Sequence, residues 1–343
     1  LSVLFGSLSW VGESSGQGKE HLYLTISTQL PRPLAMGGAF TAINDDLAAL
    51  LYNPASFSLY RDDRVRRLTL FFNPIAPIVA LREPEALFGR STITSEEALA
   101  AFAMLIKGVA LSVGSFEFGA LLGEQAPNEY LLSSARVFDA HGYIDNHYHV
   151  LAAKMRVAER VSLGGSIGLY YSRNVQESRK WGLGASYGVQ VTPLRNVLVG
   201  VSYITLPDQQ RDYREALDRI VDGALNFGIS VHSNFGTILA ADIRNLNEEK
   251  AHAGELIREV HLGMEQIVLS HLALRAGIFR KRHESAEDRH AISLGLGLAD
   301  VNGFWPAKRR FNHPNWLLNY GMVTEKMVGA RRFFHTVSLI WRW

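Results

Sequence analysis

The stretch that decides the fold is VSLGGSIGLYY at residues 161–171, together with WGLGASYGVQVT at residues 181–192. In both stretches apolar residues recur at alternate positions, and the positions between them carry mainly Gly and Ser. A period of two indicates a β-strand whose two faces meet different surroundings. The small face distinguishes these strands from those of a soluble sandwich, whose outward face usually carries longer polar side chains.

The same alternation recurs along the chain, and it predicts an antiparallel sheet of about fourteen strands. The clearest runs are about ten residues long, which suits a tilted strand that crosses a bilayer. The predicted strands span residues 65–73, 108–113, 115–124, 148–158, 161–171, 181–192, 196–205, 224–233, 235–244, 257–267, 271–280, 289–299, 316–325 and 333–343.

Composition and charge narrow the class of protein. Hydrophobic residues make up 47% of the 343 residues and the formal net charge is only +2, which indicates a folded chain that does not bind nucleic acid. No stretch reaches about 18 uncharged apolar residues, so no transmembrane helix is predicted. A membrane role therefore requires a closed barrel, in which every strand pairs on both sides. The predicted fold class is all-β, a transmembrane antiparallel β-barrel.

The predicted connections alternate between short turns and longer, more charged loops. The short connections lie near 159–160, 193–195, 234 and 268–270, and the long ones at 74–107, 125–147, 172–180, 206–223, 245–256 and 281–288. Outer-membrane barrels have this asymmetry, with their short turns in the periplasm. The connection 300–315 is an exception, because it is long but lies on the short-turn side.

The loop at 74–107 contains a predicted helix. Thr94 and Glu97 form a capping box, and ALAAFAMLI at 98–106 follows them. Because this helix is apolar nearly all round, we expect it to be buried in the barrel mouth or to touch lipid. It is interpreted either as a lid or as a packed structural helix.

The last strand, FFHTVSLIWRW at 333–343, alternates and ends on the aromatic Trp343. Such an ending resembles the signal by which the barrel-assembly machinery recognises its substrates. With the loop asymmetry, it predicts a protein of the outer membrane of a Gram-negative bacterium, in contact with membrane lipids and lipopolysaccharide.

The N-terminal part of the chain carries a motif that is not strand-like. Residues 31–57 are PRPLAMGGAFTAINDDLAALLYNPASF, with a glycine pair, an acidic pair and an Asn-Pro-Ala triplet. The glycines allow close backbone approach or positive φ, the acidic pair can cap a short helix, and the proline would end it. A compact element before a barrel has its natural place in the lumen. The predicted division is therefore 1–60 for the N-terminal segment and hatch and 61–343 for the barrel.

This motif resembles the N-terminal hatch of the FadL superfamily, the outer-membrane transporters of long-chain fatty acids and hydrocarbons, which also includes PorV-like barrels. HLGME at 261–265 and LALRAG at 272–277 resemble a late strand pair of PorV-like members. The resemblance implies a fourteen-stranded barrel in which a hydrophobic ligand enters from outside and the hatch shifts to release it. The implied hatch residues are Gly37, Gly38, Phe40, Asp45, Asp46, Asn53, Pro54 and Ala55. No fatty-acid carboxylate-binding motif of the family can be matched.

Charged residues on the late strands are predicted to face the lumen. They are Asp242, Arg244, Glu259, His261, Glu265 and Arg275. Three interpretations stay open: they bind a polar head group, they hold the hatch, or they form an ion-pair network that only fills a narrow barrel. Charges at such positions require partners or water.

The long connection 300–315 carries an aromatic and basic set, namely Phe304, Trp305, Lys308, Arg309, Arg310 and Phe311. In the periplasm this set would suit a protein partner or lipid head groups. The alternative is an ordinary loop packed under the barrel.

The sequence favours no catalytic or metal chemistry. It has no cysteine, no nucleophile elbow and no phosphate loop, so neither an enzyme nor a cofactor is predicted. His141, His147 and His149 cluster without a compelling further ligand, so no metal site is predicted. Two functions remain: a FadL-type channel for hydrophobic small molecules, or a PorV-like barrel that serves as a scaffold or accessory subunit of an outer-membrane complex.

Overall fold

The computed structural model describes most of the sheet and the hatch. The described residues are 21–24, 31–44, 47–56, 67–74, 94, 95, 98, 105–125, 146–173, 179–205, 224–244, 246, 259–268, 271–281, 289–299, 316–327 and 330–342. Asp45, Asp46 and the whole connection 300–315 therefore lie outside the described residues.

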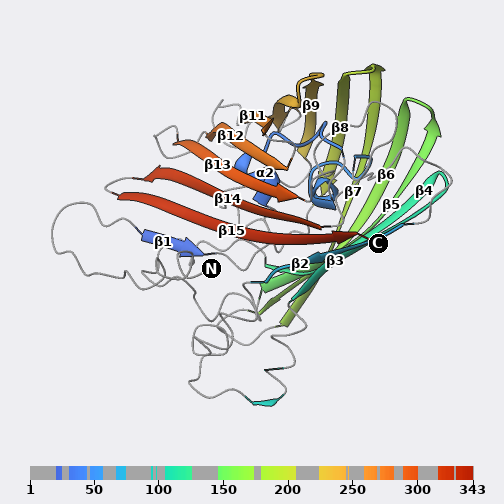
Figure 1. The fold of residues 1–343 in the computed structure, drawn as a ribbon. Coiled ribbons are helices and arrows are strands. Elements are labelled where there is room, and N and C mark those ends of the chain that lie inside the picture. Colours follow the sequence, from blue (N-terminus) through green and yellow to red (C-terminus); the bar gives the residue numbers. More distant parts are fainter. Residues whose placement is uncertain are drawn as a thin grey trace, which may run out of the picture.

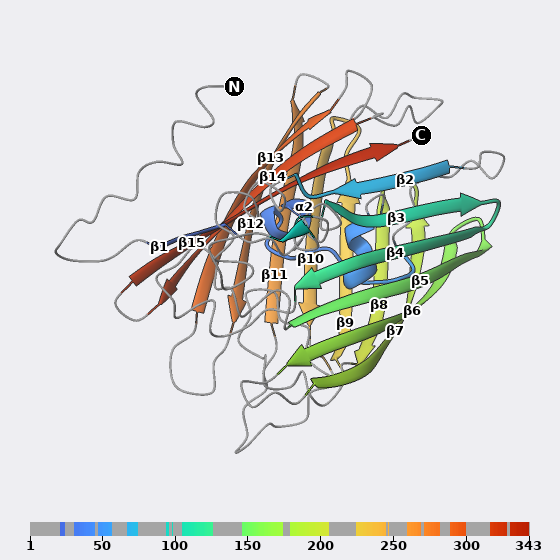
Figure 2. The same ribbon diagram turned by 90° about the horizontal axis from the view of Figure 1, so that it is seen from below.

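Fourteen antiparallel strands, β2 to β15, form a sheet in chain order that closes where β15 pairs with β2 (Figures 1 and 2). The strands are β2 (Arg67–Phe72), β3 (Ile106–Val113), β4 (Phe116–Gln125), β5 (Asn146–Ala158), β6 (Val161–Arg173), β7 (Arg179–Leu194), β8 (Val197–Thr205), β9 (Ala224–His232), β10 (Thr237–Arg244), β11 (Glu259–Val268), β12 (Leu272–Lys281), β13 (Arg289–Ala299), β14 (Trp316–Met327) and β15 (Ala330–Arg342). The predicted fourteen-stranded barrel is confirmed, and each predicted span overlaps one strand.

The two faces of the wall follow the alternation in the sequence. On β6 the outward Leu163, Ile167 and Leu169 are exposed, whereas the inward Ser166 and Gly168 are buried. On β13 every second residue from Ile292 to Leu298 is likewise an exposed apolar side chain. A continuous apolar outer face belongs in lipid, and the small inner face leaves room for the hatch.

The described part of the hatch, residues 31–44 and 47–56, lies inside the ring of strands and contains two short helical elements (Figure 1). They are α2 (Pro31–Ala35) and the 3₁₀ helix η2 (Leu47–Leu51). Between them Gly37 and Gly38 have φ values of 63° and 75°, so the left-handed turn here requires residues without a side chain. No helix among the described residues is long and apolar enough to cross a bilayer.

The start of the helix predicted in the loop 74–107 is described in part. The Ala98 N–H donates to the Thr94 carbonyl, as in a first helical turn. β3 begins at Ile106, two residues before the predicted start of that strand, so Ile106 is a strand residue and not the last residue of a helix. The residues 99–104 lie outside the described part of the chain.

One further strand was not predicted. β1 (His21–Leu24) pairs parallel with β15, His21 opposite Arg332 and Leu24 opposite His335 (Figure 2). Four residues are too short a run to give a periodic signal, and a parallel partner over 300 positions away gives none.

Candidate functional site

One side of the lumen, which we name the polar wall, holds the hatch by charged groups. The polar wall consists of Asp242 and Arg244 on β10, Glu259, His261 and Glu265 on β11, and Arg275 on β12, all buried. The Asp242 carboxylate accepts the backbone N–H groups of Phe40 and Thr41, each at 2.8 Å. The Arg244 guanidinium donates to the Gly38 carbonyl. In the turn after α2, backbone N–H groups and a backbone carbonyl are thus both hydrogen-bonded to charged side chains of the polar wall.

Glu265 forms the strongest link between wall and hatch. Its two carboxylate oxygens accept from Nε and Nη2 of Arg32, each at 2.9 Å, in a bidentate pair. The same carboxylate accepts from Arg275, whose Nη1 donates to the Asn319 side chain at 2.8 Å. A buried carboxylate shared by two guanidinium groups is satisfied only while both remain, so loss of either group leaves a buried charge poorly paired.

The peptide of Gly37 is fixed from both sides. Ser293 Oγ accepts the Gly37 N–H at 2.9 Å and donates to the Ala35 carbonyl at 3.1 Å. His261 Nδ1 lies 2.6 Å from the Gly37 carbonyl oxygen, and its other ring nitrogen lies 3.3 Å from Glu259. The two adjacent backbone groups of this left-handed turn therefore both have buried partners on the wall.

The Asn-Pro-Ala triplet fixes the C-terminal half of the hatch by hydrogen bonds of Asn53. Asn53 Nδ2 donates to the Thr41 carbonyl at 3.0 Å and to Val189 of β7 at 3.2 Å, while its Oδ1 accepts from Ala55 at 2.9 Å. Gln190 of β7 adds a bond to the Ala42 carbonyl at 3.0 Å. Asn53 thus ties the two ends of the hatch turn to each other and to the wall.

Inward glycines let the hatch backbone approach the wall. We name as the glycine belt the strand glycines at which an added Cβ would lie less than 3.0 Å from a hatch atom. They lie on β3, β6 to β9 and β11 to β14 and are Gly108, Gly164, Gly188, Gly200, Gly228, Gly263, Gly277, Gly295 and Gly321. At Gly277 the hatch atom is the Gly37 nitrogen, and at Gly200 it is the Thr41 carbonyl oxygen. Any larger residue there would displace the hatch or the strand.

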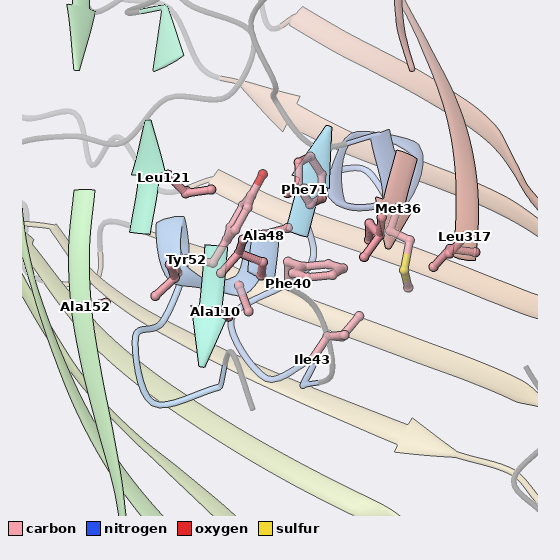
Figure 3. Packing of buried hydrophobic residues seen from close by; sticks show 14 of the residues in the cluster. Met36, Phe40, Ile43, Ala48, Tyr52, Phe71, Ala110, Leu121, Ala152 and Leu317 are labelled. Atoms are coloured by element: carbon pink, nitrogen blue, oxygen red, sulfur yellow. The ribbon is translucent and has the colours of Figure 1, made fainter. Parts of the chain in front are cut away.

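The opposite side of the lumen meets the hatch mainly with hydrocarbon, and its strands β3 to β5 also carry the buried Lys107, Glu117 and Lys154. We name as the apolar wall the buried residues Phe71, Ala110, Leu121, Val150, Ala152 and Ile340, from β2 to β5 and β15. They form one cluster with hatch residues that include Met36, Phe40, Ile43 and Tyr52 (Figure 3). The Phe40 and Tyr52 rings lie 5.6 Å apart at the centre of this cluster.

The structure places the predicted lumen residues as follows. Asp242, Arg244, His261 and Glu265 contact the hatch directly, and Glu259 and Arg275 support two of them. Gly37, Gly38, Phe40, Asn53, Pro54 and Ala55 all lie in the hatch and are buried. Asp45 and Asp46 lie outside the described residues, as do Phe304, Trp305, Lys308, Arg309, Arg310 and Phe311.

Sequence reasoning missed Arg32, Ser293 and Gln190, which all bond hatch to wall. Arg32 carried a usable signal, because a lone cation in an otherwise apolar, glycine-containing segment needs a buried anion as partner. Ser293 and Gln190 carried none, since their positions look like ordinary members of a small inner face. Within the described part of the chain, no group of three His, Asp or Glu residues could hold a metal ion.

Comparison with known proteins gives a match in structure only, because no family model and no curated protein sequence matches. CymD, described as a monoaromatic hydrocarbon channel, superposes with a TM-score of 0.51 at 12% identity, over 91% of this chain and 96% of that one. The fold is similar to that of a hydrocarbon channel. This likeness confirms, for the fold, the predicted resemblance to FadL-type barrels.

Two toluene transporters give lower scores. TbuX of Ralstonia pickettii has a TM-score of 0.47 at 13% identity, covering 91% of this chain and 97% of that one. TodX of Pseudomonas putida has 0.48 at 12% identity, covering 95% and 99%.

Proposed function

We propose that this protein is a channel that passes hydrophobic small molecules across the outer membrane of a Gram-negative bacterium, with the hatch as its gate. The observation that carries the proposal is the unequal lumen. The hatch is bonded to the polar wall through ions and backbone groups, but it meets the apolar wall through an apolar cluster. In a lumen divided in this way, we expect a hydrophobic molecule to pass between the hatch and the apolar wall.

Energetics favour opening on that side. Removing one partner from the buried ion network of the polar wall costs about 3–5 kcal/mol, since a charge is left unpaired. Separating the hatch from the apolar wall exposes hydrocarbon, and an entering apolar molecule covers it again at about 0.8 kcal/mol per buried CH₂ group. The ligand itself therefore offsets the cost of its passage, whereas water or an ion cannot.

Two further features support the proposal. The outer face of the barrel is apolar, so the protein can reside in a bilayer. The fold is similar to that of a protein whose description is a monoaromatic hydrocarbon channel. We extend the ligand class to alkanes and fatty acids, because the hydrocarbon contacts of the apolar wall can be replaced by acyl chains as well as by aromatic rings.

The second candidate function is a non-transporting scaffold, and the glycine belt is the observation that favours it. The belt holds the hatch closely against nine strands, as a permanent plug would be held. In this case the aromatic and basic set at 300–315 would serve as the surface for a periplasmic protein partner.

Uptake measurements separate the two candidates. The protein is expressed in the outer membrane of a host without hydrocarbon channels, and entry of labelled toluene, n-octane and oleate is followed, with sucrose as a polar control. A channel should accelerate at least one hydrophobic probe and leave sucrose unchanged. Unchanged entry of all three probes, together with co-purification of a partner that depends on residues 300–315, would establish the scaffold.

A further inference from the structure

An apolar groove lies on the outer face of the barrel, across strands β9 to β12, which are neighbours in the sheet (Figure 2). Its volume is about 500 Å³, within the range of about 300–1,000 Å³ that is usual for sites of small molecules. Large outward side chains form its sides, among them the exposed Ile229, Leu239, Leu262 and Ile278. The groove therefore opens toward the lipid that surrounds the barrel.

Two alanines create the groove. Ala241 on β10 and Ala276 on β12 occupy outward positions, and the neighbouring outward positions on both strands carry Leu or Ile. Ala241 is opposite Leu262 of β11, and Ala276 is opposite Met264 of the same strand. The two alanines thus lie on either side of β11, between larger side chains. Because the residues that line this recess are all apolar, it suits hydrocarbon and not a polar solute.

The floor of the groove is backbone that carries the hatch on its other side. Gly263 and Gly277 line the groove, and an added Cβ at either glycine would meet hatch atoms of Met36 or Gly37. The β10–β11 and β11–β12 ladders pair without a register shift. The groove is therefore a recess in an intact wall and not an opening toward the lumen, so a molecule bound in it stays outside the barrel.

The two ends of the groove differ in charge. Arg280 occupies the next outward position of β12 after Ile278, and its side chain is exposed. Beyond the opposite end, neutral Thr237 and Gln266 face each other, and Thr237 Oγ1 donates to Gln266 Oε1 at 2.6 Å. A molecule with an apolar tail and an anionic head is complementary to this arrangement when its head lies beside Arg280.

The position of Arg280 indicates the leaflet from which such a molecule comes. β12 ends at Lys281, and the connection to β13 that follows is on the side of the longer connections, which face the exterior in outer-membrane barrels. The short connection between β9 and β10, residues 233–236, is on the opposite, periplasmic side. A head group beside Arg280 therefore belongs to the outer leaflet. The anionic lipid of that leaflet is lipopolysaccharide, whose lipid A part carries phosphate groups and several acyl chains.

We propose that the groove across β9 to β12 binds an acyl chain of lipid A, with Arg280 at a lipid A phosphate. Arginine can bind phosphate through two parallel N–H···O bonds, so both charge and geometry contribute to recognition. The acyl chain covers Ala241 and Ala276 in the recess between the larger side chains. This inference requires that the protein resides in the outer membrane, but it does not depend on transport through the lumen.

Native mass spectrometry of the full chain in detergent tests the proposal, with one added lipid at a time. The probes are lipid A, dephosphorylated lipid A and phosphatidylethanolamine. We expect one lipid A per barrel, bound about tenfold or more tightly than either of the other lipids, because only lipid A combines the phosphate for Arg280 with acyl chains on a head group of matching size.

Filling the groove tests the site of the acyl chain. Ala241→Leu with Ala276→Leu places two large side chains in the recess, so the affinity for lipid A should fall by about tenfold or more. The matched control is Ala153→Leu with Ala185→Leu, which adds the same side chains at exposed outward positions of β5 and β7. The control should leave the affinity within about twofold of that of the unmodified protein.

Substitutions of Arg280 test the site of the phosphate. Arg280→Ala should lower the affinity for lipid A to that for dephosphorylated lipid A, while binding of the dephosphorylated lipid stays unchanged. Arg280→Lys should restore part of the affinity, because lysine supplies the charge without the planar fork. A general loss of stability would instead weaken the binding of both lipids.

Three results would overturn the inference: no saturable binding of lipid A, equal affinity for all three lipids, or unchanged affinity in the groove-filling variant. A dimer of the unmodified barrel that groove filling abolishes would also contradict it, because a second copy would then cover the groove. Ala241→Val and Ala276→Val replace the double variant if that variant does not assemble. Uptake of hydrophobic probes is measured separately, so a failure of the lipid A site is distinguishable from a failure of the channel function.

Discussion

The polar wall and the apolar wall contact the same hatch through different physics. On the polar wall each contact is directional, and its loss leaves a buried charge or backbone group without a partner. On the apolar wall the contacts are interchangeable hydrocarbon, which a ligand can replace. The comparison teaches that a plug held firmly on one side could still separate from the other side, as the proposed channel requires.

The largest effect is expected from Glu265→Ala. Arg32 and Arg275 would lose their shared carboxylate, at a cost of about 3–5 kcal/mol, and the hatch would detach from the polar wall. Ion conductance in planar bilayers should rise, and protease should cleave the hatch. Met264→Ala, the exposed lipid-facing neighbour, is the control and should leave conductance unchanged. Equal conductance of both variants would show that the polar wall does not hold the hatch.

A smaller effect is expected from Asp242→Asn. The amide keeps one acceptor oxygen for the N–H groups of Phe40 and Thr41 but loses the negative charge, and charge-assisted bonds are worth about 1.5–3 kcal/mol. Hydrogen exchange at these two amides should accelerate. Ile243→Val on the outward face is the control. Unaltered protection in Asp242→Asn would mean that the turn is held by other bonds.

The glycine belt predicts an effect of similar or smaller size. Gly277→Ala places a methyl group against the Gly37 nitrogen, and such overpacking costs about 1–3 kcal/mol. The variant should unfold at lower denaturant concentration and leak more readily. Gly165→Ala is a matched control, because its Cβ would meet its nearest neighbour at 3.7 Å. If the two alanine variants were equally stable, the close approach of hatch to wall would be disproved.

The smallest effect is expected on the apolar wall. Ile340→Val removes one buried methyl group at a cost of about 0.5–1.5 kcal/mol and widens the path beside Phe71. Uptake of the largest accepted probe should increase slightly, while hatch protection stays as in the unmodified protein. The exposed Ile292→Val is the control. Faster hydrogen exchange of the hatch amides in Ile340→Val would contradict the idea that only the polar wall holds the hatch.

The strands could be predicted from the sequence because each one carries its own signal. Leu163, Gly164 and Ser166 reveal a strand and its two faces without any knowledge of neighbours. The period also showed that Asp242 and Glu265 face the lumen. It could not show what they contact, since Arg32 lies 233 positions from Glu265. The side of the sheet on which a residue lies follows from the local sequence, whereas the residue that it contacts in the lumen depends on the closed fold.

The hatch illustrates the same limit. Gly37 and Gly38 predicted close backbone approach or positive φ, and Pro54 predicted the end of a short helix, but neither indicated the strands against which the hatch would lie. The small inner residues at Gly188 and Gly277 were evident in the alternation. Only the closed barrel shows that these glycines make room for the hatch of the same chain.

The glycine belt also has a consequence for biogenesis. An inward wall that approaches the hatch this closely on nine strands leaves little clearance for a folded hatch to thread into a finished ring. We therefore expect the N-terminal segment to dock on the growing sheet while it is still an open surface, with β15 meeting β2 afterwards. Because the hatch precedes the barrel strands in the sequence, it is synthesised first, and we expect the strands to assemble around it.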